Sequence, residues 1–399
     1  MLSSNRVNIG KRIMGVVPAL ALSLSLAACG GGGNQTANNN ATPGTEASPG
    51  AAKEATASSP GKLDLGGNVQ LTGAGASFPA PLYETWFQGL NQKYPSLQVN
   101  YQSTGSGAGV EQFTKGTVDF GASDVAMKDE EIAKVPADRG VILLPMTAGS
   151  IVLAYNLADV PELKLPRTVY TDILLGKIKS WDDPAIAKAN PGAKLPKQAI
   201  NVVRRADGSG TTAVFTKHLS AISPEWKTKV GEGKEVKWPV GQAAQKNDGV
   251  AAQINQTPGS IGYLEYGFAK SSNLKVAALE NKAGKFVVPD DKSAAQTLAS
   301  VPLPDNLRAF ISDPEGEGSY PIVTYTWLLV YKKYPDAAKA KAVEAMIEYG
   351  LNEGQTKAAE LGYVPLPANV VQKVAAAADQ ISPEYKISVG GAGGATAGK

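Results

Sequence analysis

The alternation of short β-rich runs with longer helical stretches is the feature that most constrains how this chain can fold. Expected strands cover residues 69–72, 97–102, 118–121, 141–145, 150–156, 200–204, 260–264 and 324–331. Expected helices cover residues 81–93, 110–114, 129–134, 168–175, 211–219, 248–256 and 337–351. Because helices usually supply the crossovers between parallel strands, this order predicts an α/β fold with mainly parallel sheets flanked by helices.

Four loops share one physical character, because each follows an expected strand, is rich in Gly, Ser or Thr, and opens a helix. They span residues 73–81, 103–109, 121–124 and 204–212. Such loops present free backbone N–H groups and the positive end of a helix dipole, which together favour an anion. In open α/β sheets they gather at the carboxyl ends of the strands. An arginine adds a bidentate cation, and the residues alone do not choose between Arg204 and Arg205.

The amino-terminal residues 1–28 are typical of an export signal, since three cationic side chains precede an apolar run that is short for a membrane span. The run ends in Leu-Ala-Ala-Cys at Cys29, which resembles the bacterial lipobox. In signals of that kind the cysteine thiol receives diacylglyceryl, the signal is cut before the cysteine, and the new amino terminus is acylated. We therefore expect a lipid anchor on Cys29, where several acyl chains hold a protein stably at a membrane. An ordinary cleaved signal with a chance cysteine and an uncleaved anchor are the alternatives. Cys29 is the only cysteine, so the chain forms no internal disulfide.

The composition of the chain distinguishes its terminal segments from its folded body and argues against one class of binding partner. Residues 30–61 lack aromatic and large aliphatic side chains, so we expect residues 29–67 to form a disordered linker. Residues 386–399 are expected to form a flexible tail. Without the three cations of the export signal, Lys and Arg equal Asp and Glu in number. A neutral body without a basic tract argues against a nucleic-acid partner.

Several long blocks closely resemble the PstS phosphate-binding proteins of ABC phosphate importers. The main blocks are Gly-Ala-Gly-Ala-Ser-Phe-Pro-Ala-Pro at 73–81, Val-Asp-Phe-Gly-Ala-Ser-Asp at 118–124, Leu-Gly-Lys-Ile-Lys-Ser-Trp-Asp-Asp at 175–183 and Val-Arg-Arg-Ala-Asp-Gly-Ser-Gly-Thr at 203–211. Residues 237–241, 247–250 and 258–263 are similar to later blocks of that family. The resemblance runs from about residue 71 to residue 385.

The resemblance implies the two-lobe periplasmic-binding-protein fold of type II, in which the chain crosses twice between the lobes at a hinge. Lobe one would comprise residues 68–156 plus 321–385, and lobe two residues 157–320. The implied function is capture of inorganic phosphate in the cleft between the lobes and delivery to the permease subunits of an ABC importer. The protein would work outside the cytoplasm, in the periplasm or at the outer face of the cytoplasmic membrane, tethered through Cys29.

The resemblance also implies a set of phosphate ligands. They are Ser77, Phe78, Ser106, Asp124, Arg205, Ser209, Gly210 and Thr211, with Asp207 as a supporting residue that orients Arg205. Asp124, which read alone is a turn or capping residue, would accept the proton that phosphate carries near neutral pH. Sulfate has no such proton, so the carboxylate would discriminate against it.

Three alternatives remain beside this interpretation. A secreted hydrolase of phosphate esters is poorly supported, because the chain has one histidine, His218, and no Asp/His cluster with metal-ligand spacing. We accordingly expect no catalytic residue, no metal and no cofactor. The same fold could instead bind sulfate, molybdate or arsenate, and a sensor could keep the same pocket for signalling.

Overall fold

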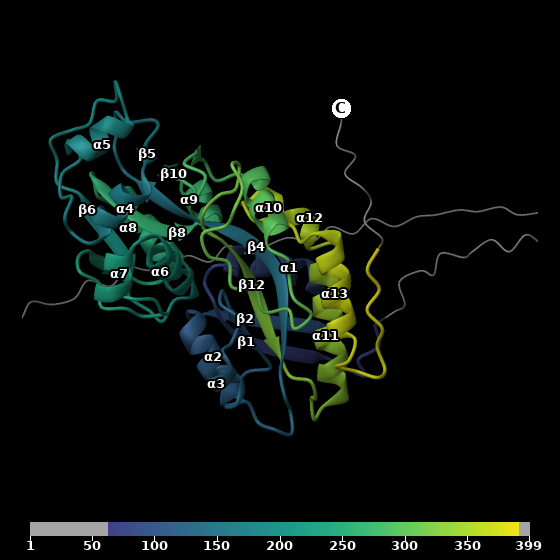
Figure 1. Ribbon diagram of the computed structural model, residues 1–399. Helices are drawn as coiled ribbons and strands as arrows, with labels where there is room; N and C mark the ends of the chain where they lie inside the picture. The colour runs from purple at the N-terminus through teal and green to yellow at the C-terminus, as the bar shows by residue number, and fades with distance from the viewer. Residues whose placement is uncertain (1–62, 391–399) are drawn as a thin grey trace, which may run out of the picture. The chain divides into compact units, whose positions relative to one another are not determined.

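A nine-stranded sheet in the order β2-β1-β3-β12-β4-β8-β6-β7, with β9 also paired to β4, runs through the protein (Figure 1). The computed structural model describes residues 63–390, which all fall in the unit from Gly61 to Lys399. The strands of this sheet are β1 (Val69–Gly75), β2 (Leu97–Ser103), β3 (Phe120–Ser123), β4 (Ile142–Tyr155), β6 (Asn201–Arg205), β7 (Gln242–Ala244), β8 (Ser260–Glu265), β9 (Lys275–Val276) and β12 (Val323–Val330). A small second sheet joins β11 (Phe286–Val287), β10 (Ala278–Glu280) and β5 (Lys164–Leu165).

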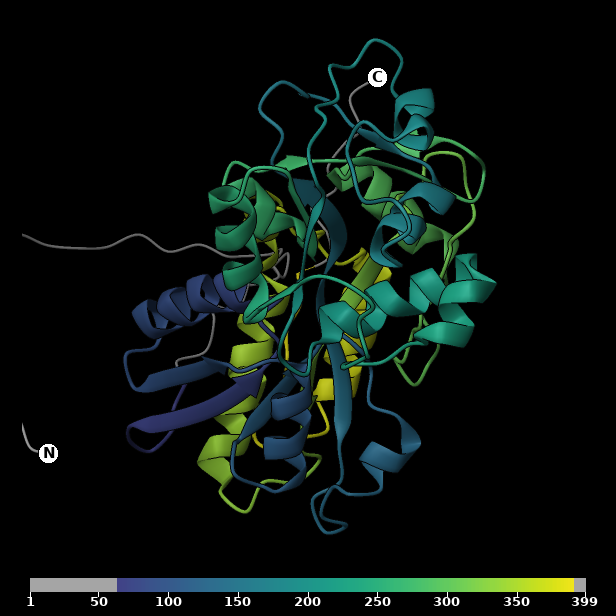
Figure 2. The same ribbon diagram turned by 90° about the vertical axis from the view of Figure 1, so that its left-hand side faces the viewer.

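Helices flank the large sheet along its length. They are α1 (Ala80–Lys93), α2 (Ser106–Thr114), α3 (Asp129–Ile132), α4 (Arg167–Leu174), α5 (Pro184–Ala189), α6 (Gly210–Ile222), α7 (Pro224–Lys229), α8 (Lys246–Gln256), α9 (Tyr266–Ser271), α10 (Asp291–Ser300), α11 (Ala337–Leu351), α12 (Gln355–Ala358), the 3-10 turn η1 (Ala359–Leu361) and α13 (Ala368–Ala378). Figures 1 and 2 show α11 packed beside α13, whereas α8 packs on β6 and β8 at the other end.

The sheet is more mixed than the strand–helix alternation predicts. At one end β1 pairs in parallel with β2 and β3, and at the other end β6 pairs in parallel with β7 and β8. Between them β12 lies antiparallel to both β3 and β4, and β4 lies antiparallel to β8. Two of these three antiparallel pairs involve β12, which lies between β3 and β4 although both strands precede it by many residues in the sequence. Local sequence patterns carry no information on such a long-range insertion.

Strand β4 joins the two parallel ends of the sheet. The sequence predicts two strands here, at 141–145 and 150–156, whereas the structure has one strand of 14 residues that is buried almost throughout. Its pairing with β12 shifts register where Trp327 faces Pro145 and Thr326 faces Thr147. The shift is a β-bulge, which accommodates the missing N–H of Pro145 and lets the strand continue. The second half of β4 then pairs with β8.

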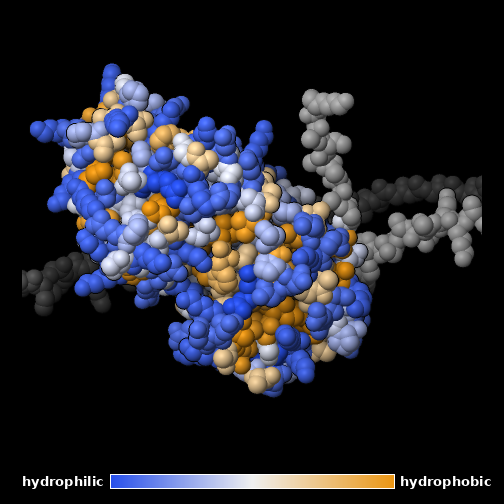
Figure 3. Space-filling model, viewed as in Figure 1, coloured by the Kyte–Doolittle hydropathy of each residue, from blue (hydrophilic) through white to orange (hydrophobic). Residues whose placement is uncertain are grey.

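Several sequence-based expectations concern residues outside the described part of the chain. The export signal at 1–28, Cys29 and most of the linker precede residue 63, and residues 391–399 follow the last described position. Among residues 63–390, no helix is both long enough and apolar enough to cross a bilayer. The face seen in Figure 3 is mainly hydrophilic with smaller hydrophobic areas, as is usual for the surface of a folded protein.

Close packing of α2 on the sheet yields a test of the fold. A Cβ atom on Gly109 would lie 2.4 Å from the Cα of Gly75 and 2.8 Å from the carbonyl oxygen of Ala122. We expect Gly109→Ala to lower the free energy of unfolding by about 1–3 kcal/mol in chemical denaturation, because backbone must move to admit the methyl group. Gly67→Ala is the control, since nothing lies within 4 Å of its added Cβ. Equal midpoints for the two variants would contradict this packing.

Candidate anion-binding site

The first of the four loops is fixed by two tyrosine hydroxyls. The hydroxyl of Tyr101 donates to the carbonyl oxygen of Ala76, and that of Tyr363 to the carbonyl oxygen of Phe78, each at 2.7 Å. Ser77 lies between these anchored carbonyls and is buried. Among residues 63–390, no hydrogen bond uses the N–H of Ser77 or of Phe78. The loop therefore holds two adjacent backbone donors free for a ligand.

The second and third loops bring Ser106 and Asp124 together. The Ser106 Oγ lies 3.4 Å from the Asp124 Oδ2 and accepts the N–H of Asp124 at 3.2 Å. On its other side, the carboxylate Oδ1 accepts a hydrogen bond of 3.0 Å from the Thr326 hydroxyl of β12. Asp124 is 1% exposed. Its carboxylate is thus held by a neighbouring strand while one oxygen faces the second loop.

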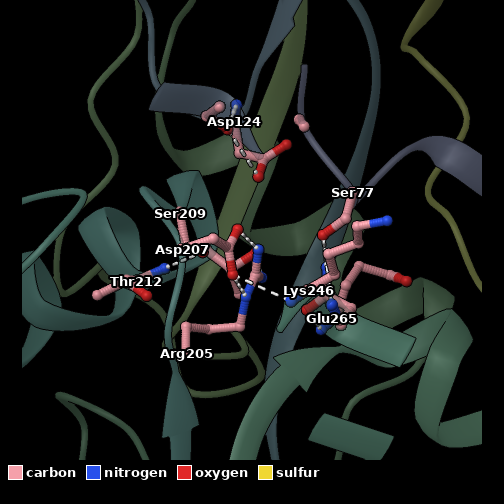
Figure 4. Close-up of polar contacts among 12 residues, drawn as sticks. Ser77, Asp124, Arg205, Asp207, Ser209, Thr212, Lys246 and Glu265 are labelled. Atoms are coloured by element: carbon pink, nitrogen blue, oxygen red, sulfur yellow. Dashed lines mark hydrogen bonds and ion pairs between the residues drawn. The ribbon is translucent and has the colours of Figure 1, made fainter. Parts of the chain in front are cut away.

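The fourth loop supplies a buried guanidinium. Arg205 ends β6, and its Nε and Nη2 atoms donate to the two carboxylate oxygens of Asp207 at 2.8 and 2.5 Å. Its Nη1 lies 3.3 Å from the Thr211 Oγ1. The Arg205 side chain is 1% exposed, whereas Arg204 is only partly buried. Figure 4 shows Arg205, Asp124 and Ser77 turned toward one another.

The amino-terminal end of α6 abuts the second and third loops. Ser209 caps this helix by accepting the N–H of Thr212 at 3.0 Å, and the N–H groups of Gly210 and Thr211 precede the first intrahelical hydrogen bond. A Cβ on Gly210 would lie 2.4 Å from the Ser106 Oγ and 2.7 Å from an Asp124 carboxylate oxygen. Only glycine permits this approach, so the helix directs its free donors at the same place as the other loops.

The electrostatic state of the two acids differs sharply. Burial raises the pKa of Asp124 to about 7, although hydrogen bonds from Thr326 and Ser106 and the charge of Arg205 partly offset this effect. Burial also acts to raise the pKa of Asp207, but the hydrogen bonds and charge of Arg205 outweigh it and leave that pKa below its ordinary value. Asp207 therefore stays ionised and balances the guanidinium, while Asp124 can exchange a proton near neutral pH.

The arrangement combines many hydrogen-bond donors with a single acceptor. The sequence-predicted ligand residues from all four loops gather in one buried region, which suits a tetrahedral oxyanion that carries a proton. His218 lies apart from them, with its Nε2 at 2.7 Å from the Tyr170 hydroxyl, and burial lowers the pKa of His218 to about 3. Within the described residues no group of three or more His, Cys, Asp or Glu side chains could hold a metal ion.

Sequence reasoning missed four residues that hold the site in place. They are Asn247, Glu265, Thr326 and Tyr363. Glu265 is fully buried, accepts the N–H of Gly267 at 2.8 Å, and has a pKa raised well above its ordinary value by burial. Asn247 falls in a block that resembles the phosphate-binding family, and this was the one available signal for any of the four residues. The role of each follows from long-range contacts.

Removal of the Asp124 charge should stabilise the empty protein at high pH. Because its carboxyl has a higher pKa when folded than when unfolded, ionisation opposes folding above the unfolded value of 3.8 and most fully above about pH 7. In ligand-free protein at pH 8, we expect Asp124→Asn to raise the Tm by several degrees, for a gain on the order of 4 kcal/mol at most. The gain should vanish at pH 4.

Asp138→Asn provides the control for this comparison because Asp138 is exposed, and its Tm should match that of the wild type at both pH values. A lower Tm for Asp124→Asn at pH 8 would show that the buried carboxylate stabilises the fold.

Comparison with known proteins identifies the family. Residues 44–352 match a model described as a PBP superfamily domain. The phosphate-binding protein PstS of Pasteurella multocida is 44% identical over 80% of this chain and 92% of its own length, and that of Haemophilus influenzae is 42% identical over 79% and 94%. A solved phosphate-binding protein from Stenotrophomonas maltophilia shares the fold with a TM-score of 0.62 and 20% identity, over 77% of this chain and 94% of its own.

This chain has the two-lobe periplasmic-binding-protein fold of type II. The curated relatives show the family as well, because they are 44% and 42% identical to this chain along most of both sequences. This chain belongs to the PstS phosphate-binding protein family within the PBP superfamily.

Proposed function

We propose that this protein binds inorganic phosphate and delivers it to an ABC importer, as a binding protein and without catalysing a reaction. The observation that carries the proposal is the convergence of donors from the first, second and fourth loops on the buried carboxyl group of Asp124, which the third loop supplies. The names of its curated relatives, phosphate-binding proteins PstS, support the same ligand. A hydrolase would need a nucleophile or a metal beside the anion. A set of hydrogen-bond donors with one acceptor is instead what a protein needs to bind a protonated oxyanion.

In this proposal the phosphate oxygens are held by neutral dipoles and one cation. The donors are the hydroxyl and N–H of Ser77, the N–H of Phe78, the hydroxyl of Ser106, the guanidinium of Arg205, the hydroxyl of Ser209, the N–H of Gly210, and the N–H and hydroxyl of Thr211. Asp207 supports the site by orienting Arg205. Asp124 is the acceptor, and it faces the oxygen of phosphate that carries a proton.

The acceptor determines which anions fit. Two descriptions of the bound state are equivalent. Monobasic phosphate beside ionised Asp124 and dibasic phosphate beside protonated Asp124 hold the same number of protons, one of which lies between the carboxyl group and the anion. Sulfate brings no proton, so it binds only after Asp124 has taken one from solvent. Arsenate carries a proton as phosphate does, and the same geometry admits it.

Closure of two lobes over the anion completes the proposal. We assign residues 68–156 and 321–385 to lobe one and residues 157–320 to lobe two. Contacts between these segments include the N–H of Gly107 on the carbonyl oxygen of Gly208 at 2.8 Å and an ion pair of 2.6 Å between Lys234 and Glu131. Hinge motion between the lobes would make and break such contacts as the anion enters and leaves.

The proposed location follows from the residues that precede the folded body. The export signal at 1–28 would direct the chain out of the cytoplasm, and acylated Cys29 would anchor it at the outer face of the membrane or in the periplasm. The part of the linker 29–67 that precedes Leu65, which is buried in the core, would give the body freedom to reach its partner. The permease subunits of the importer are the proposed partner. The described part of the expected tail, residues 386–390, is bound to the folded body, because the N–H groups of Ile387, Ser388 and Gly390 donate to Asp379, Glu348 and Asn352.

Calorimetry on protein stripped of ligand tests the proposed function through the two adjacent arginines. We expect the wild type to bind phosphate and Arg205→Ala to weaken it by about a hundredfold or more, because Asp207 is then left buried without its cation. The control Arg204→Ala should change the affinity less than about threefold. Equal losses would mean that Arg205 is no ligand, and a wild type that does not bind phosphate would refute the function itself.

Anion preference tests the role of Asp124. We expect Asp124→Asn to narrow the preference of the protein for phosphate over sulfate, which in the wild type can reach about 10⁴ for sites of this kind. In the wild type, sulfate affinity should also increase as the pH falls from 8 to 6, because Asp124, with a pKa of about 7, gains its proton in that range. The asparagine variant should show no such dependence. Unchanged affinities for both anions would contradict the assigned role.

A further inference from the structure

The first turn of α8 contacts two separate parts of the anion site. The N–H of Lys246 donates to the Asp207 Oδ1 at 3.0 Å, on the carboxylate that orients Arg205. The next residue, Asn247, donates twice to the hydroxyl oxygen of Ser77, through its N–H at 3.3 Å and its side-chain Nδ2 at 3.1 Å. Figure 4 shows Lys246 between Asp207 and Ser77.

The two hydrogen bonds from Asn247 determine the polarity of the Ser77 hydroxyl. A hydroxyl has one proton to donate and two lone pairs that accept. Both lone pairs of the Ser77 Oγ are engaged by N–H groups of Asn247, so only the donor function remains. Within residues 63–390 no acceptor takes this proton. Ser77 is therefore prepared to donate, which is what an oxyanion requires.

The orientation of the Asn247 amide is itself fixed. Its Oδ1 accepts the N–H of Glu265 at 3.2 Å, which leaves the Nδ2 side to face Ser77. Glu265 is held in turn, because its side chain caps α9 through the N–H of Gly267 at 2.8 Å. Asn247 is 0% exposed, and a buried amide that rotated would place oxygen against oxygen at Ser77 and N–H against N–H at Glu265.

The backbone of this turn is strained. Lys246 has a φ of 59°, in the left-handed region that non-glycine residues rarely adopt. Such strain persists where the surroundings over-determine a conformation, and it is frequent at binding sites. Here the surroundings are Asp207 and Ser77, which bind successive N–H groups of the same turn.

We propose that Asn247 is a positioning residue of the anion site, which makes the Ser77 hydroxyl an obligate donor and links it through the α8 turn to the Arg205–Asp207 pair. The inference rests on the proposed function, in which the site receives phosphate. Ser77 belongs to the proposed lobe one and Asn247 to lobe two, so the hydroxyl acquires its polarity only when the lobes are closed. Closure and ligand recognition are then coupled at a single side chain.

A double-mutant cycle tests this coupling, with phosphate affinity measured by calorimetry on stripped protein. We expect Asn247→Ala and Ser77→Ala each to weaken phosphate binding about tenfold, which is the loss of one or two hydrogen bonds. The double variant should bind about as well as either single one, because Asn247 acts through the hydroxyl. Ser77→Thr, which restores a hydroxyl, should recover both the affinity and the sensitivity to Asn247→Ala.

Asn247→Asp provides a variant of the same shape in case the alanine variant folds poorly. It keeps an oxygen for the N–H of Glu265 but replaces the Nδ2 donor by an acceptor that competes for the Ser77 proton. Asn247→Asp should lower the phosphate affinity strongly when Ser77 is present and only slightly in the Ser77→Ala background. If the new carboxylate simply repelled the anion, the loss would be similar in both backgrounds. Asn255→Ala, on the exposed surface of the same helix, is the matched control and should leave the affinity unchanged.

The same cycle is also read from the Tm at saturating phosphate, where the lobes are closed over the anion and the Ser77–Asn247 contacts are formed. If the wild type binds phosphate, two results in the double variant would overturn the inference. They are losses of affinity that multiply and decreases in Tm that add. A wild type without phosphate affinity would instead refute the proposed function, and non-additive Tm values would still establish the coupling of the two residues.

Discussion

The guanidinium of Arg205 lies almost wholly out of water, and Asp207 holds it through two hydrogen bonds of 2.8 and 2.5 Å. A buried charge without a partner would be prohibitive, so this pair must be complete before the surrounding elements can pack. The Arg205–Asp207 pair also connects neighbouring elements. The N–H of Arg205 donates to the Tyr263 hydroxyl of β8, and that hydroxyl contacts Thr212 in α6 at 2.7 Å. Asp207 also accepts the N–H of Lys246 in α8.

Because Asp207 balances the cation, the site has little net positive charge to offer an anion. Binding must then depend on the direction of dipoles, which are the N–H groups of the first loop, the amino-terminal end of α6 and several hydroxyls. Dipoles attract every oxyanion of similar shape. In the proposed function, discrimination therefore falls to the one group that can reject a ligand, the carboxyl group of Asp124, whose pKa burial raises to about 7.

Much of the fold near the site could be predicted from local sequence, because its elements obey local rules. The predicted boundaries of α1 and α11 agree with the structure to within one residue, and the loops that open α1, α2 and α6 are marked by glycine and hydroxyl side chains. What could not be predicted depends on contacts between distant segments. The merging of two expected strands into β4 depends on β12, which arrives some 180 residues later in the chain.

The site divides in the same way. Family-like blocks indicated Ser77, Asp124, Arg205 and their neighbours in the loops, and the structure brings these residues together. Among the residues that prepare them, only Asn247 lies in a family-like block, and that block gives no indication of its role. Thr326 looks like an ordinary strand residue until β12 lies beside β3, and Asn247 looks like an ordinary residue at a helix start until α8 meets the first loop. The residues proposed to contact the anion can therefore be predicted from sequence blocks, whereas the residues that orient them are found only from the three-dimensional contacts.

The central claim is that one proton is shared between Asp124 and the bound anion. Proton release on binding, obtained by calorimetry at pH 6 in buffers of different ionisation enthalpy, tests it most directly. At that pH free phosphate is mostly monobasic, with two protons, and Asp124, with a pKa of about 7, mostly holds one. The proposed complex holds two of these three protons, so phosphate should release about one proton and sulfate almost none. Equal proton release for the two anions would contradict the account.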